Sequence, residues 1–206
     1  MMEFSEIVKK RRSANNFLAD HPITQKELDE IFDLVKLSPS AFNLQHASYI
    51  VVKDPAVKEQ VKEAAFGQFK VSSASAVVAV LGNMKAYTKV SEIYMGLKML
   101  GALTEEEYNK ITDETISFYE AQGEAFQKEE AIRNASLSAM LFMLAAKEKG
   151  WDTCPMIGFD PAQIKNLLNV KEGYEVVMLV AVGKEKEESR RPRGYRKPVS
   201  EFVAYI

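Results

Sequence analysis

Three short apolar runs constrain the fold of this 206-residue chain more than any other feature. Residues 47–52, 74–81 and 174–182 have the length and apolar composition that are typical of buried β-strands. Longer segments with helical spacing of apolar residues lie between them, and the two kinds of segment do not alternate regularly. Regular alternation is typical of a doubly wound parallel sheet, so the pattern favours another mixed arrangement with few strands and more helix. The chain length fits one domain.

The remaining elements are expected to be helices over residues 4–12, 24–36, 55–65, 84–99, 104–122, 124–149 and 161–168. Thr24 and Glu27 have the spacing of a capping box at the start of the second helix. Asp160 and Pro161 are suited to the N-cap and first turn of the last helix. Residues 154–161 are predicted to form a loop.

The chain is poor in the side chains that most often carry catalysis, because it has one cysteine, Cys154, and two histidines, His21 and His46. This excludes an internal disulfide framework and a cysteine-rich zinc site. We interpret Cys154 as a packed small hydrophobe. If the protein is an enzyme, a group other than its side chains is expected to carry the reaction.

The N-terminal residues do not have the pattern of a secretory signal, and the most apolar stretch, residues 135–146, is shorter than the roughly 20 residues of a membrane span. A single thiol fits a reducing compartment. These features predict a soluble, cytoplasmic protein with no membrane partner.

Charge is unevenly placed although the formal net charge is −2. Residues 9–12 are all basic, and residues 184–197 hold seven basic residues and three glutamates, whereas residues 104–130 hold nine acidic residues and two lysines. Each run is typical of a solvated face. If the two basic ends meet, however, they form one site for a phosphate group, which arginine binds through two parallel hydrogen bonds. Nucleic acid is not expected as a partner, because no nucleic-acid-reading motif is present.

Five motifs lie in an informative order along the chain. They are Arg11-Arg12-Ser13 followed, after six intervening residues, by Asp20-His21-Pro22-Ile23, the segment Ser38 to Gln45, the strand Ala74 to Val78, the segment Pro155 to Asp160, and the tail pattern Arg-x-x-Arg-Lys-Pro. In this order and at these separations, the set resembles the FMN-dependent nitroreductase family over essentially the whole chain.

The resemblance implies an α+β fold with a mainly antiparallel central sheet flanked by helices, forming one domain over residues 1–206. It also implies a homodimer in which a tail, about residues 184–206, wraps the partner subunit. A helical excursion, about residues 104–130, would form a lid, where Phe118, Tyr119 and Phe126 are candidates either for stacking on substrate or for core packing. Each of two FMN sites would draw residues from both chains.

The resemblance also assigns cofactor-binding residues position by position. Near the phosphate and ribityl end, with Asn15 beside the flavin, it places Arg11, Arg12, Ser13, Arg193 and Arg196. From the other subunit it places Ser38, Pro39, Ser40, Asn43 and Gln45 along the flavin. It places Gln68 and Lys70 at the ribityl and pyrimidine end, and Pro155, Ile157 and Gly158 at the flavin N5 and O4 edge. Reduced flavin gains negative charge near N1 and O2, where a lysine or an amide donor would stabilise it, and Gly158 would permit close backbone approach at N5.

The implied function is transfer of hydride from NADH or NADPH to flavin N5 and of electrons onward to a nitroaromatic, quinone or flavin acceptor by a ping-pong mechanism. The flavin would perform the chemistry, so no catalytic side chain and no metal is assigned. Two alternatives stay open. One is a flavin-binding redox sensor or carrier without turnover, and the other is a specialised relative such as a dehalogenase or a flavin-fragmenting enzyme.

Overall fold

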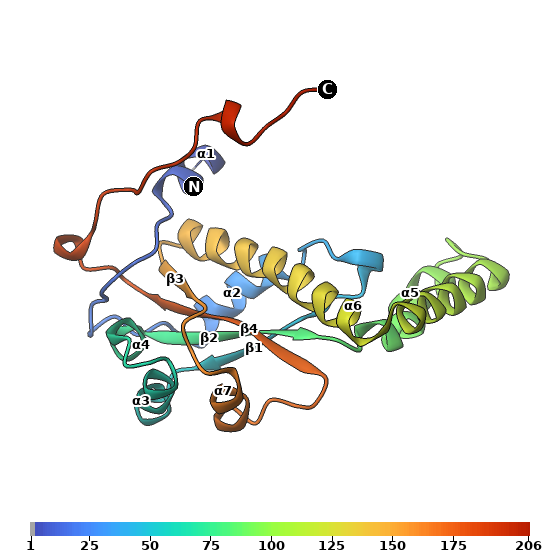
Figure 1. The fold of residues 1–206 in the computed structure, drawn as a ribbon, viewed down its shortest axis with the longest axis horizontal. Helices are drawn as coiled ribbons and strands as arrows, with labels where there is room; N and C mark the ends of the chain where they lie inside the picture. The colour runs from blue at the N-terminus through green and yellow to red at the C-terminus, as the bar shows by residue number, and fades with distance from the viewer. Residues whose placement is uncertain (1–2) are drawn as a thin grey trace.

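A four-stranded antiparallel sheet forms the centre of the computed structural model, which describes residues 3–206 (Figure 1). The strands are β1 (Ala47–Val52), β2 (Ala76–Asn83), β3 (Asp152–Met156) and β4 (Tyr174–Gly183), in the order β1-β2-β4-β3. All three neighbouring pairs are antiparallel. The α+β fold implied by the resemblance is therefore confirmed.

Seven α-helices accompany the sheet. They are α1 (Phe4–Lys10), α2 (Gln25–Val35), α3 (Pro55–Ala64), α4 (Phe69–Ser73), α5 (Val90–Met99), α6 (Glu105–Glu148) and α7 (Pro161–Leu167) among the described residues. The capping box at α2 is confirmed, because Thr24 Oγ1 accepts from the Glu27 amide at 3.2 Å and Glu27 accepts from the Thr24 amide at 2.9 Å. Asp160 caps α7 as predicted. The short helix α4 was not expected.

The prediction of a loop over residues 154–161 is wrong for its first part, which belongs to β3. Cys154 pairs with Ala181 and Pro155 pairs with Val180 across the β3–β4 ladder. Proline has no amide hydrogen to donate, so it fits only a strand with one free side. β3 is such an edge strand, since β4 is its one neighbour in the described sheet.

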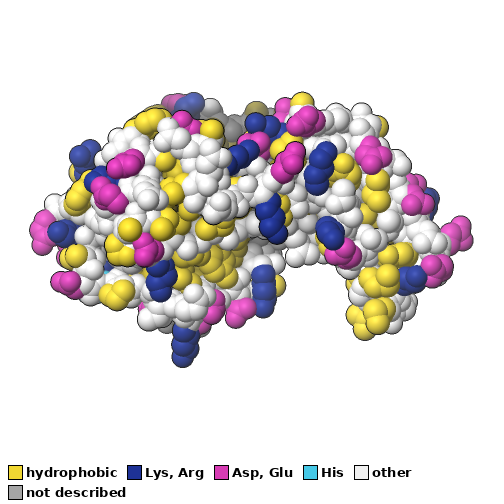
Figure 2. Space-filling model, turned by 90° about the horizontal axis from the view of Figure 1, so that it is seen from below, with side chains coloured by type: hydrophobic (Ala, Val, Ile, Leu, Met, Phe, Trp, Pro, Cys, Tyr) yellow, Lys and Arg dark blue, Asp and Glu magenta, His cyan; other side chains and the backbone are white. Residues whose placement is uncertain are grey.

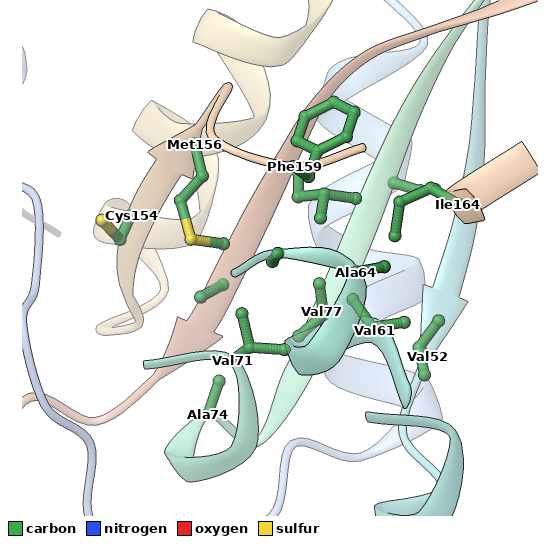
Figure 3. Close-up of a cluster of buried hydrophobic side chains, with 14 of the residues drawn as sticks. Val52, Val61, Ala64, Val71, Ala74, Val77, Cys154, Met156, Phe159 and Ile164 are labelled. Atoms are coloured by element: carbon green, nitrogen blue, oxygen red, sulfur yellow. The ribbon is translucent and has the colours of Figure 1, made fainter. Parts of the chain in front are cut away.

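The sheet is buried on both faces, because β2 sends alternate side chains into two cores. Val77, Ala79 and Leu81 pack with α3, α4 and α7, and Figure 3 shows Val77 among Val61, Val71 and Ile164 in this core. Ala76, Val78 and Val80 pack on the other face against α2 and the second half of α6. The apolar stretch at residues 135–146 is thus a core helix, as its spacing indicated. Within the described residues, no helix is both long and apolar enough to cross a membrane.

The long helix α6 breaks at Gly123, whose φ of 76° and ψ of −179° are not helical. This confirms the predicted separation of residues 104–122 from residues 124–149. The part of α6 before Gly123 and the whole of α5 project from the sheet as a helical lobe (Figure 1). Figure 2 shows hydrophobic side chains gathered on this lobe, where Leu97, Met99 and Leu100 are exposed. Tyr119 is 1% exposed and packs in a small core under the lobe, so it is a core residue.

Candidate functional site

The two basic ends of the chain meet and enclose a cavity of about 200 Å³, here called the arginine cavity. Its N-terminal wall contains Arg11, Arg12, Ser13 and Asn15. Its C-terminal wall contains Arg190, Arg191, Arg193 and Arg196. The tail runs beside the N-terminal segment in Figure 1, so both walls come from one chain.

Arg193 ties the two walls together. Its Nη2 donates to the backbone oxygen of Lys9 at 2.6 Å and to that of Arg11 at 3.0 Å, across a sequence separation of more than 180 residues. Among the described residues, Arg196 instead donates only to the nearby carbonyl oxygens of Gly194 and Tyr195. Arg193 thus shapes the cavity by holding the tail in place. Some of its N–H donors are occupied by these two backbone oxygens and are not free for a ligand.

The arginine cavity has an excess of positive charge. Glu185, a buried carboxylate on its wall, accepts from Arg190 Nε at 3.0 Å and raises the pKa of Arg190. Burial, followed by repulsion from Arg193 and Arg196, lowers the pKa of Arg11, although an arginine stays protonated at neutral pH. Within residues 3–206, no carboxylate pairs with Arg11, Arg191 or Arg196. These guanidinium groups are available to an anion.

A second group of candidate residues lies where α4 meets the end of β3. Gln68 Nε2 donates to the Gly158 oxygen at 2.7 Å, and a Cβ atom on Gly158 would lie 3.3 Å from that nitrogen, so the close approach favours glycine. Ile157 is 82% exposed. Burial raises the pKa of the Cys154 thiol despite the opposing charges of Lys70 and Arg11, so Cys154 is not a reactive thiolate.

The first two groups are neighbours. Ser13 forms a parallel bridge with Thr153 of β3, and the Ala14 amide donates to the Thr153 oxygen at 3.0 Å. This pairing places the N-terminal wall of the arginine cavity next to β3. Pro155 follows two residues later in the same strand, which leads directly to Ile157 and Gly158. The structure therefore brings together two motifs, at the N-terminus and at the sheet edge, that lie about 140 residues apart in the sequence.

The third group, segment 38–45, lies to the right of α2 in Figure 1, whereas α4 and the part of the tail beside α1 lie to the left. It contains the one-turn 3-10 helix Ala41–Asn43. Together with α2 and α6, the segment borders a second cavity of about 260 Å³, whose wall includes Ser38, Pro39, Ser40 and Gln45. Within one chain, the structure does not bring this group together with the other two.

His46 also borders the second cavity and is 1% exposed. Neither ring nitrogen has a hydrogen-bond partner among the described residues. Burial lowers the pKa of His46 to about 4, so the ring is neutral at pH 7.

Two residues of these sites were not predicted from the sequence. Glu185 looked like one acid in a basic tail, although it is buried beside Arg190. Asn134 directly precedes the apolar stretch of α6 and is 4% exposed, and its Oδ1 accepts from the Ala41 amide at 2.7 Å. A polar residue in line with an apolar helical stripe was the available signal for Asn134.

The chain is similar to known proteins over its whole length. The model of the nitroreductase family matches residues 8–184. A Bacillus subtilis protein named "Putative NAD(P)H nitroreductase MhqN" is 61% identical over 206 residues, covering 100% of both chains. The crystal structure of a "putative nitroreductase ydfN" from Bacillus subtilis has a TM-score of 0.96 and 59% identity, covering 98% of each chain. A "putative nitroreductase in complex with FMN" from Exiguobacterium sibiricum has a TM-score of 0.91 and 29% identity, covering 100% of this chain and 98% of the other.

These similarities, with the antiparallel sheet and the arginine cavity, define the class of the protein as an NAD(P)H-linked oxidoreductase. The chain belongs to the nitroreductase family, whose members depend on FMN. The family membership expected from the five sequence motifs is therefore confirmed.

Proposed function

We propose that the protein binds FMN and uses NADH or NADPH to reduce nitroaromatic, quinone or flavin acceptors. The arginine cavity is the observation that carries this proposal. Its uncompensated guanidinium groups match the charge and the fork geometry of a phosphate ester. The adjoining group around Gln68 and Gly158 offers an amide and exposed backbone to a polar ring. The donor set therefore fits a flavin mononucleotide.

Each wall of the site has a separate task in this proposal. Arg11, with Arg12 and Ser13 beside it, binds the phosphate together with Arg196. Arg193 binds mainly by holding the tail against the N-terminal segment. Lys70 places a cation at the ribityl and pyrimidine end, where it stabilises negative charge. Gln68 lies at the same end, and because its Nε2 donates to the Ala65 and Gly158 oxygens, its Oε1 is the atom left to accept a hydrogen bond. Asn15, Pro155, Ile157 and Gly158 border the ring.

FMN, when bound, supplies the hydride and electron transfer. The side chains position it and set the electric field around it, so none acts as a nucleophile. Because Ile157 is 82% exposed, the adjoining face is open to a nicotinamide or to an acceptor in turn. We therefore propose ping-pong kinetics, for which double-reciprocal plots at several fixed acceptor concentrations give parallel lines.

We propose that segment 38–45 completes the FMN site of a second copy in a homodimer. Exposed apolar side chains support this, because Leu137 and Met140 are exposed on the second half of α6, Leu37 is exposed just after the end of α2, and apolar patches mark interaction surfaces. In the tail, residues 184–206, Val199, Phe202 and Tyr205 are exposed apolar side chains suited to contact with a partner subunit. The helical segment of residues 104–130 would act as a lid.

The test begins with the purified protein. We expect a yellow protein whose flavin absorbance bleaches on addition of NADH or NADPH and returns on addition of a quinone. A colourless protein that does not take up added FMN would overturn the proposal. Bound flavin without steady-state oxidation of NADH or NADPH in the presence of a quinone would favour a sensor or carrier over an enzyme.

A further inference from the structure

Segment 38–45 has a strained backbone. Phe42, Asn43 and Gln45 all have positive φ, at 50°, 53° and 52°. Among the described residues, only two other non-glycine residues have positive φ, Phe66 and Asn169. Left-handed backbone is unfavourable for such side chains and persists only where the surroundings impose it. The contacts that impose this conformation therefore decide which way Asn43 and Gln45 point.

One contact comes from a distant and rigid part of the fold. Asn134 lies on α6 and is 4% exposed, and its Oδ1 accepts from the Ala41 amide at 2.7 Å. Ala41 is the first residue of the 3-10 helix that begins the left-handed stretch. Most other hydrogen bonds of the segment are local, such as those from the Gln45 amide to Ser40 Oγ at 2.9 Å and from Gln45 Nε2 to the Asn43 oxygen at 3.4 Å. Tyr94 also donates to the Phe42 oxygen, at 3.3 Å.

Asn134 is itself held in orientation by its own helix. Its Nδ2 donates to the Glu130 backbone oxygen at 2.8 Å and lies 3.4 Å from Glu130 Oε2. Glu130 also accepts from the Tyr119 hydroxyl at 3.2 Å and pairs with Arg133. These bonds direct Nδ2 toward Glu130 and thereby direct Oδ1 toward Ala41. Buried amides with all their partners in place specify one geometry.

We propose that Asn134 is a positioning residue that holds segment 38–45 in its left-handed conformation, so that Asn43 and Gln45 are presented to the flavin. Glu130 acts indirectly, because it orients the Asn134 amide. This inference rests on the proposed function, because it concerns the same FMN site. It assigns a role in cofactor binding to two α6 residues that are not among the proposed FMN contacts.

The test compares two buried amides of α6 with different partners. Asn134→Ala removes the bond to Ala41. The control, Gln127→Ala, removes an equally buried amide that bridges Lys85 and the Tyr119 oxygen and has no bond to segment 38–45. Hydrogen exchange of peptides spanning residues 39–46 is measured in the apoprotein, and FMN affinity is measured by fluorescence titration. We expect Asn134→Ala to speed exchange in this segment and to weaken FMN binding about tenfold or more relative to the control.

A rescue variant separates positioning from general damage. In Asn134→Asp the carboxylate still accepts from Ala41, but it can no longer donate to the Glu130 backbone oxygen and it repels the Glu130 carboxylate. The double variant with Glu130→Gln removes the charge repulsion and supplies a side-chain donor at position 130, while the bond to the backbone oxygen stays lost. We expect the double variant to exchange more slowly in residues 39–46 and to bind FMN more tightly than Asn134→Asp alone, with a visible circular dichroism of the bound flavin closer to that of the wild type. Unchanged exchange in Asn134→Ala, or faster exchange with unchanged FMN affinity, would overturn the inference. A wild-type protein that binds no FMN would instead overturn the proposed function, and the exchange measurement alone would then report on the segment.

Discussion

The arginines of the arginine cavity have different partners, and this predicts different costs of removing them. Arg196 donates only to neighbouring carbonyl oxygens of the tail, so its charge remains available to a phosphate. We expect Arg196→Ala to weaken FMN binding by about 1.5–3 kcal/mol, or roughly 10- to 150-fold in the dissociation constant. Fluorescence titration of the apoprotein measures this. Lys197→Ala is the matched control, because it removes a neighbouring exposed cation that does not line the cavity. Equal affinities for the two variants would contradict the assignment of Arg196.

A single buried histidine is expected to make stability depend on pH. Folded His46 has a pKa of about 4, whereas the ordinary value is 6.5, so between these values only the unfolded chain takes up the proton. The free energy of unfolding is therefore undiminished above about pH 6.5 and falls as the pH drops toward 4. Protonation of His46 in the unfolded chain lowers the free energy of unfolding by at most about 3 kcal/mol.

His46→Leu removes this titration. We expect the free energy of unfolding of the variant to increase relative to that of the wild type as the pH is lowered from about 7 to about 5. Urea unfolding of the apoprotein at a fixed protein concentration measures both. A difference between variant and wild type that is the same at both pH values would show that His46 is not the titrating group. His21→Leu serves as a control at the chain's other histidine, which is exposed.

At the scale of elements, the break in α6 depends on one glycine. Gly123 has a φ of 76° and a ψ of −179°, a region that only glycine enters readily. Because nothing lies within 4 Å of a Cβ built there, a substitution acts through the backbone and not through a clash. We expect Gly123→Ala to lower the free energy of unfolding by about 1–3 kcal/mol. Gly96→Ala is the matched control, because Gly96 lies inside α5 with equally open space and should gain about 0.5–1 kcal/mol. Denaturant unfolding of both variants tests the contrast.

Elements with strong local signals were predictable from the sequence, and elements defined by tertiary contact were not. The capping box at Thr24 and the apolar runs of β1, β2 and β4 gave the helix start and three strands within about two residues. β3 was mistaken for a loop, because Pro155 is typical of turns and only its place at the sheet edge makes it acceptable in a strand. The five-residue helix α4 is too short to show a periodic pattern.

The candidate site was also predictable from the sequence only in part. The charge pattern predicted that two basic ends could meet, and the structure places Arg11 and Arg196 around one cavity. The sequence could not show that Arg193 would donate to backbone carbonyls, since that bond exists only when the tail folds over the N-terminal segment. Nor could it show that Asn134 contacts Ala41 across 93 residues. Both are long-range hydrogen bonds that no local pattern encodes.

At the scale of the whole molecule, segment 38–45 lies apart from the arginine cavity within one chain (Figure 1). The proposed function places both at one FMN site, so each site requires two copies of the chain. This arrangement is testable by complementation. One variant carries Arg11→Ala with Arg196→Ala, and the other carries Asn43→Gly with Gln45→Gly. Glycine is chosen at the last two positions because it removes the side chain and accepts the positive φ of 53° and 52° without strain.

We expect each variant alone to form a dimer with weak FMN binding, because both of its sites lack one wall. The mixed dimer, isolated with two different affinity tags, has one site in which both walls are damaged and one in which both are intact. It should therefore bind one FMN per two chains with wild-type affinity, as measured by flavin absorbance against protein concentration. If each site lay within a single chain, every site of the mixed dimer would carry one damaged wall and high-affinity binding would not return. The stoichiometry thus distinguishes a site shared between two chains from a site within one chain, independently of any catalytic assay.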